Sequence, residues 1–254
     1  MALDIFSIIL ALSAALCAGL VGGFAQLKRI VLAGDVMSHI ALPGLGLALL
    51  YHLNPLLGGA TTMLVGVVLI WHLEKQTGLT TETTIGVIFA AAVALGALVT
   101  PEGDLIDALF GSTRVPTILE FGIGMFVALI IVLFILAYRS KLIITFFSPE
   151  LASATGIKIE RVNLFFLLAF GATIMLGLQF LGALLMGALI IIPAAIARQM
   201  THRLNWFMAI SAGASMLATA LGLFIAPRYG FPLGPTIVTV AAAMFVISLL
   251  KKKD

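Results

Sequence analysis

Long apolar runs separated by short polar intervals dominate the chain. Nearly uninterrupted runs occupy residues 4–27, 30–51, 56–73, 84–100, 118–138, 206–226 and 234–250. About 20 consecutive apolar residues are enough for an α-helix to cross the hydrocarbon core of a bilayer. The pattern therefore predicts a series of membrane-spanning helices.

One apolar segment, residues 163–197, is too long for a single span. It contains about 35 residues without a charge, whereas about 20 suffice for one crossing. Division near residues 179–182 gives two helices and a total of about nine spans. A re-entrant piece in this segment would reduce the total to about eight.

Composition supports the same fold class. Hydrophobic residues make up 62% of the 254 residues and charged residues 10%, whereas a soluble domain is about half apolar and a quarter charged. We expect an all-α integral membrane protein, a polytopic helix bundle in one domain over residues 1–254, with the lipid bilayer as its solvent. The net charge of +3 does not indicate nucleic-acid binding, because the basic residues fall in short loops. Cys17 is the only cysteine and has no intrachain disulfide partner.

The basic loops predict the orientation. Short loops rich in Lys and Arg face the cytoplasm, and such residues follow the first span, flank 148–156, follow 197 and end the chain at 251–253. The C-terminus is then cytoplasmic, the N-terminus is outside, and the acidic stretch 101–117 lies on the outer side. The first segment lacks a basic N-terminal region, so we expect a retained span rather than a cleaved signal peptide.

The second span carries two polar residues of interest, Asp35 and His39. Four residues apart on a helix, they share one face, separated by roughly 40° and about 6 Å of rise. A carboxylate in the centre of a span costs about 3 kcal/mol, so a functional role is expected. Both groups suit divalent zinc or manganese, and a site of only two ligands suits a path that must release its ion. The alternative is that Asp35 only caps the helix near its cytoplasmic end, with His39 as a packed polar residue.

Small residues indicate close helix contacts. Pro43 and Gly44 predict a kink or a tight contact in the second span. Ala183 and Gly187 have the small-xxx-small spacing that lets membrane helices approach closely.

A short helix is expected in the basic loop after the fifth span. Ser148 can cap it, Pro149 suits its first position, Glu150 favours its positive end and Gly156 can terminate it. Two turns are too few for independent stability, so the helix should dock on another surface. The residues assigned to this docking are Ser148, Pro149, Glu150, Leu151, Ala152 and Gly156.

Common catalytic signatures are absent from the sequence. It contains no G-x-x-x-x-G-K-[ST] phosphate-binding loop, no H-E-x-x-H and no G-x-S-x-G. The chain is therefore not expected to be an enzyme, and any ATP hydrolysis is expected on another chain.

Taken together, several motifs make the chain resemble the permease subunits of bacterial zinc/manganese ABC importers, over nearly its full length. They are G-D-V-M-S-H-I-A-L-P-G (34–44), L-E-K (73–75), S-P-E-L-A (148–152), F-L-G-A-L-L (180–185) running into I-I-P-A-A (191–195) and Arg198, and G-P (234–235) followed by K-K (251–252).

This resemblance implies partners and roles. Such permeases work as homodimers in the plasma membrane, with two copies of an ABC ATPase subunit on the cytoplasmic face and a metal-binding protein outside the cell. The helix at 148–156 would be the coupling helix that seats in the ATPase. Asp35 and His39 would line the path of a divalent metal, which is a transported substrate and not a bound cofactor. The loop at 71–82 lacks the histidine cluster of a zinc-collecting segment, because His72 is its only histidine.

The sequence also allows two other functions. One is a stand-alone secondary transporter that uses Asp35 as a proton or sodium site, which would have no need of the capped cytoplasmic helix. The other is a permease for siderophores or cobalamin, whose bulky cargo would need no paired membrane ligands. Zinc, manganese and ferrous iron all accept Asp and His ligands, so the residues favour none of the three.

Overall fold

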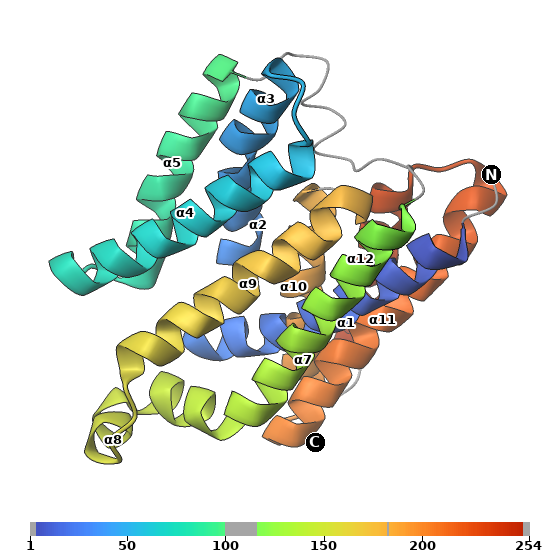
Figure 1. The fold of residues 1–254 in the computed structure, drawn as a ribbon. Helices are drawn as coiled ribbons and strands as arrows, with labels where there is room; N and C mark the ends of the chain where they lie inside the picture. Colours follow the sequence, from blue (N-terminus) through green and yellow to red (C-terminus); the bar gives the residue numbers. More distant parts are fainter. Residues whose placement is uncertain (1–3, 100–115, 182, 251–254) are drawn as a thin grey trace.

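The computed structural model describes residues 4–99, 116–181 and 183–250, and within these ranges it contains helices and no strands. Figure 1 shows their arrangement. The helices are α1 (Ile5–Lys28), α2 (Ala33–Ser38), the 3₁₀ helix η1 (His39–Ala41), α3 (Leu42–Leu50), α4 (Pro55–Thr77), α5 (Thr81–Val99), α7 (Ile118–Phe147), α8 (Pro149–Ala154), α9 (Ile159–Leu181), α10 (Ala183–Met200), α11 (Leu204–Tyr229) and α12 (Leu233–Leu250). The acidic stretch predicted on the outer side falls mostly in 100–115, outside the described residues.

The helices confirm the predicted fold class. Among the described residues, eight helical segments are long and apolar enough to cross a membrane, with α2 to α3 counted as one, and the apolar part of α10 is shorter. The segment 163–197 does divide into two helices, α9 and α10. The short helix predicted in the basic loop forms as α8.

The fifth helix extends beyond the span predicted at residues 118–138. Helix α7 continues to Phe147 and has 30 residues, because Arg139 and Lys141 are good helix formers and nothing before Ser148 breaks the helix. At 1.5 Å per residue α7 is about 45 Å long, half as long again as the hydrocarbon core. Its last turns therefore extend toward α8. We call the end of the bundle that carries α8 the α8 end.

Small residues hold α1 in the centre of the bundle. Helix α1 packs against α7, α9, α10 and α11, and its buried positions are mostly Ala and Gly. A Cβ on Gly19 would lie 2.6 Å from the Ser211 carbonyl oxygen, while the Ser211 hydroxyl donates a 2.6 Å hydrogen bond to the Gly19 carbonyl. Lipid provides no hydrophobic force between helices, so close backbone contacts and interhelical hydrogen bonds supply the association.

Helices α3, α4 and α5 form a smaller group at one side of the bundle, at the upper left of Figure 1. The group is joined to the remaining helices mainly where α4 packs on α9 and where α2 packs on α10. The second span thus lies between the two parts of the molecule.

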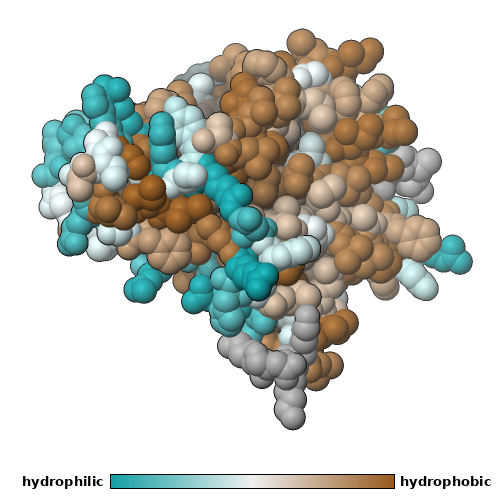
Figure 2. Space-filling view, turned by 90° about the horizontal axis from the view of Figure 1, so that it is seen from below, coloured by the Kyte–Doolittle hydropathy of each residue, from teal (hydrophilic) through white to brown (hydrophobic). Residues whose placement is uncertain are grey.

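The outer surface is strongly apolar. Leu64 of α4, Leu129 and Leu133 of α7 and Val246 of α12 are more than half exposed. Figure 2 shows broad apolar areas beside a region where hydrophilic side chains gather. A soluble monomer rarely exposes so much contiguous apolar surface, as expected for a protein that lies in lipid.

We expect Gly19→Ala to destabilise the bundle, since the added methyl group would meet the backbone of α11. Overpacking of this kind costs about 1–3 kcal/mol, equivalent to a fall of roughly 2–12 °C in melting temperature for a chain of this size. Thermal unfolding in detergent measures it. Gly213→Ala is the matched control, because no atom lies within 4 Å of its Cβ position. Equal melting temperatures for the two variants would contradict the role of Gly19.

Candidate functional site

The second span is not one continuous α-helix. The α-helical turns of α2 give way to η1 at His39, and α3 begins at Leu42. Pro43 is the second residue of α3, where its missing N–H is no loss. The His39 carbonyl instead accepts a hydrogen bond from the Leu42 N–H in 3₁₀ geometry. The kink expected at Pro43 is therefore accommodated by η1, immediately after Asp35 and Ser38.

Asp35 lies well inside the bundle. It is the third residue of α2, and Leu32, which makes no side-chain cap hydrogen bond, is the N-cap residue. A Cβ on Gly187 of α10 would lie 2.8 Å from Asp35 Cα and 2.9 Å from its Oδ1. Gly187 stands 11 residues before Arg198, which is about 16 Å along a helix. Asp35 is thus far from the basic end of α10, and it is not a helix cap.

Gly34, the residue before Asp35, lies at a comparable distance from the α8 end. A Cβ on Gly34 would lie 3.0 Å from Ile190 Cγ2, and a Cβ on Gly22 would collide with the Ile190 carbonyl oxygen. Gly34 is therefore level with Gly22, six residues before Lys28 at the end of α1, or about 9 Å. Both routes put Asp35 about 9–16 Å, measured along the neighbouring helices, from basic residues at the α8 end.

His39 faces the smaller group of helices. Its ring centroid lies 5.7 Å from that of Phe89 on α5, in an edge-to-face arrangement. The next residue, Ile40, packs on Gly66 in the middle of α4. His39 thus sits at the junction of η1, α4 and α5.

Asp35 and His39 are both half-buried. The Ser38 hydroxyl donates a 2.6 Å hydrogen bond to the Asp35 carbonyl, which fixes the turn between them. Within the described residues no group of three or more His, Cys, Asp or Glu side chains could hold a metal ion. One chain therefore offers a carboxylate and an imidazole, two groups suited to a divalent cation, and further ligands would have to come from another molecule.

The predicted packing residues lie at close contacts where the structure describes them. A Cβ on Gly44 would collide with the Gly58 carbonyl of α4, and one on Gly58 would lie 2.6 Å from Ala48 Cβ. Gly187 supports Asp35, as described above. The side chain of Ala183 lies outside the described residues.

Helix α8 has the local structure that its sequence predicts. Ser148 Oγ accepts a 3.4 Å hydrogen bond from the Leu151 N–H, Pro149 is the first helical residue, and Gly156 has a φ of +76°. Ala152 is fully buried and anchors α8 to the chain. Glu150 and Leu151 are exposed and form the free face of the helix.

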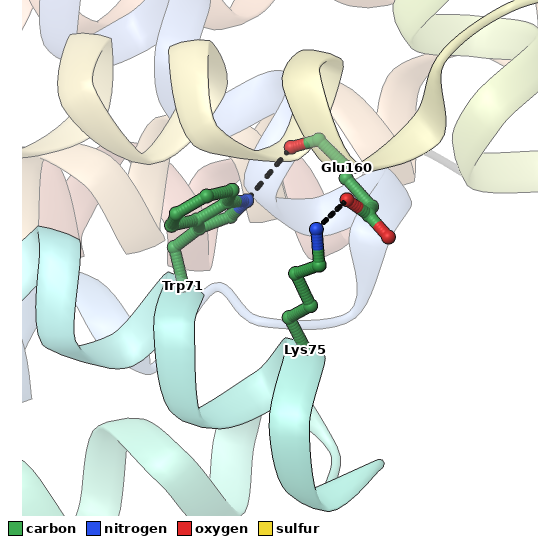
Figure 3. A network of polar contacts seen from close by, with 3 residues as sticks. All are labelled: Trp71, Lys75 and Glu160. Carbon is green, nitrogen blue, oxygen red and sulfur yellow. Dashed lines mark hydrogen bonds and ion pairs between the residues drawn. The ribbon is translucent and has the colours of Figure 1, made fainter.

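A polar connection between α4 and α9 was not anticipated from the sequence. The Trp71 indole Nε1 donates a 3.0 Å hydrogen bond to the Glu160 carbonyl, and Lys75 Nζ lies 2.7 Å from Glu160 Oε2, as Figure 3 shows. Lys75 also lies over the Trp71 ring, 5.7 Å from its centroid. Glu160 is the second residue of α9, directly after the loop from α8, so the connection joins this loop to α4. The one sequence feature that pointed to Lys75 was its place in the L-E-K motif (73–75).

The α8 end also has a polar interior. Among the described residues, no hydrogen-bond partner is found for the buried Lys28 Nζ, Glu74 Oε2 and Asn163 Oδ1 atoms, from α1, α4 and α9. Glu74 Oε1 accepts a 2.8 Å hydrogen bond from Thr81, and Lys28 lies over the Phe146 ring. Burial of charged groups is costly. This region is therefore unlike the apolar packing near the candidate site.

Comparison with known proteins gives consistent results. A family model described as "ABC 3 transport family" matches residues 5–252. The manganese transport system membrane protein MntC of Halalkalibacterium halodurans is 30% identical over 239 residues, covering 91% of this chain and 80% of that protein. The high-affinity zinc uptake system membrane protein ZnuB of Haemophilus influenzae is 28% identical over 240 residues, covering 91% of each.

A solved structure matches the fold over the same extent. PsaBC from Streptococcus pneumoniae, solved in complex with a Fab, superposes with a TM-score of 0.83 at 28% sequence identity. The match covers 98% of this chain and 92% of that chain.

Proposed function

The chain belongs to the ABC 3 transport family, and on that premise we propose that it is the membrane permease subunit of an ATP-driven importer of divalent metal ions. The observation that carries this proposal is Asp35 in the first turn of the second span, packed against Gly187 of α10 and four residues from His39. The chain that carries it is similar over nearly its whole length to permeases named for manganese and for zinc. Family membership argues against a stand-alone secondary transporter. The relatives named for metal ions argue against siderophore or cobalamin cargo.

Asp35 and His39 would contact the metal on its path. Their half-burial leaves each side chain reachable, and carboxylate and imidazole both bind zinc, manganese or ferrous iron. We propose that the chain works as a homodimer in which the twofold axis brings two such pairs together. Up to four ligands would then hold the ion, still few and weak enough to release it.

The assembly would be completed by two partners. The exposed face of α8, with Glu150 and Leu151, would seat in an ABC ATPase subunit that carries out ATP hydrolysis. A metal-binding protein would deliver the ion on the opposite side of the membrane. We propose that the α8 end lies in the cytoplasm together with the C-terminus, which the basic residues at that end support. The chain would then lie as a multi-pass protein in the plasma membrane.

Helix α4 would transmit movement of α8 to the metal site. Its last turns hold Glu160 at the start of α9, through Trp71 and Lys75. Its middle, at Gly66, packs on Ile40 beside His39, and its first turns pack on α3 at Gly44. A displacement of the α8–α9 loop by the ATPase would therefore act on one helix that also contacts η1.

We expect Asp35→Ala or His39→Ala to reduce metal uptake by about tenfold or more, since each removes a ligand from a site of few ligands. The measurement is uptake of radiolabelled zinc and manganese into vesicles that contain the complete complex. Co-purification of the ATPase should be unchanged. His202→Ala is the control, because His202 is exposed between α10 and α11. Wild-type uptake by both variants would rule out the assigned site.

Gly187→Ala should impair uptake without removing any ligand. Its methyl group would displace Asp35, whose Cα and Oδ1 are 2.8 and 2.9 Å from the new Cβ position, and misplacement of a functional group by about 1 Å can cost about 100-fold in rate. Gly213→Ala, which meets no atom within 4 Å, is the control in the same assay. Full uptake by Gly187→Ala would show that the position of Asp35 is unimportant.

Glu150→Lys should weaken association of the chain with the ATPase or lower turnover of the complex. Lys75→Glu, in contrast, should leave association with the ATPase intact and lower the amount of metal taken up per ATP hydrolysed. The Lys75–Glu160 pair is 48% and 57% exposed, so its loss should change stability by about 1 kcal/mol at most. Uptake and ATPase activity are measured on the same vesicles. The double variant Lys75→Glu/Glu160→Lys should recover coupling. Failure to recover would mean that the ion pair does not transmit the movement.

A further inference from the structure

A small basic cavity lies at the α8 end of the bundle, away from Asp35 and His39. It has a volume of about 180 Å³ and is lined by Gln26, Leu27, Arg29, Phe147 and Arg198. These residues come from the last turns of α1, α7 and α10. None of the described residues that line it is acidic.

Arg29 adopts a backbone conformation that does not suit an arginine. It terminates α1 in the left-handed region with a φ of 65°. At Gly78, Gly156 and Gly230, the chain uses glycine for the same conformation after α4, α8 and α11. Glycine is the residue without a steric penalty there. A strained non-glycine residue at such a position indicates that its side chain has a task of its own.

Within the part of the chain that the structure describes, neither arginine side chain has a binding partner. Within the described residues, neither the Arg29 nor the Arg198 guanidinium forms an ion pair or hydrogen bond, and both residues are exposed. Two like charges at one cavity repel each other unless an anion lies between them. The planar guanidinium, with its fork of N–H donors, is the protein group best suited to phosphate oxygens.

The cavity lies where apolar helices end, which is the level at which the phosphate layer of a bilayer is expected. Arg29 follows the last residue of the apolar helix α1, and Arg198 lies two residues before the end of α10. Leu27 and Phe147, the latter 66% exposed, add an apolar flank. Basic pockets between helices at this level attract anionic lipid headgroups. A volume of 180 Å³ equals about six water molecules at about 30 Å³ each, enough for a phosphodiester and part of its glycerol.

We propose that Arg29 and Arg198 bind the phosphate of an anionic phospholipid, such as phosphatidylglycerol, in the leaflet at the α8 end. Leu27 and Phe147 contact its glycerol and upper acyl chain. The bound lipid joins the ends of α1 and α10 to the end of α7, from which α8 follows. The site is independent of the metal path and does not rest on the transported ion.

The test uses the purified full chain in detergent, with phosphatidylglycerol, phosphatidylcholine or inorganic phosphate added. Native mass spectrometry measures retained lipid, and thermal unfolding measures stabilisation. The variants are Arg29→Gly, Arg198→Gln and the control Arg203→Gln, which removes an exposed arginine at the start of α11, outside the cavity. Arg29→Gly also removes the unfavourable backbone conformation, and its melting temperature without lipid shows whether loss of lipid comes from misfolding.

We expect the wild type and Arg203→Gln to retain phosphatidylglycerol over phosphatidylcholine. Arg29→Gly and Arg198→Gln should each lower that retention by about tenfold, as for the loss of a charge-assisted hydrogen bond. Arg29→Gly should have the higher melting temperature without lipid, but a smaller shift on adding phosphatidylglycerol.

Three results would overturn the proposal. Wild-type retention of phosphatidylglycerol by both cavity variants would exclude the site. Equal stabilisation by inorganic phosphate alone would make the ligand a free anion and not a lipid. Loss of ATPase co-purification in both variants, with lipid retention unchanged, would assign the arginines to a carboxylate of that partner.

Discussion

Close backbone contact between α10 and the first two spans is the constraint on which the interior depends. Ile190 meets Gly22 of α1 and Gly34 of α2, and Gly187 meets Asp35 one turn away. In lipid such contacts are the main source of helix association, because apolar side chains gain little by leaving a hydrocarbon solvent. They also allow α2 to begin against the interior of the bundle, with a carboxylate in its first turn. The depth of Asp35 is thus a property of α10 as much as of the span that carries it.

Helix α4 connects regions that are otherwise separate. It contacts α3 and η1 over its first half and the start of α9 at its end. A direct path of contacts therefore joins the α3–α4–α5 group to the α8 end without passing through the tightly packed centre around α1. The Lys75–Glu160 ion pair on that path is exposed and weak, so it can break and re-form at little cost.

The sequence predicts the fold class well, because apolar runs of span length have one physical interpretation. The caps of α8 are equally local and were predicted residue by residue. The continuation of α7 beyond the predicted span was not foreseen, since Arg139 and Lys141 end the apolar run without ending the helix. The depth of Asp35 and the Trp71–Glu160 hydrogen bond, between residues 89 positions apart, depend on tertiary contacts that no local pattern contains. The strained backbone of Arg29 is likewise visible only in three dimensions.

The length of α7 has a mechanical consequence. Its 30 residues correspond to about 45 Å of helix, about 15 Å more than the hydrocarbon core is thick. Figure 1 shows that the last turns before α8 run in a different direction from the first part of the helix. The two parts belong to one continuous helix, so no loop separates the apolar part of α7 from the tip that carries α8. A push on α8 would therefore enter the bundle through a bend in a helix and would not be absorbed in a flexible linker.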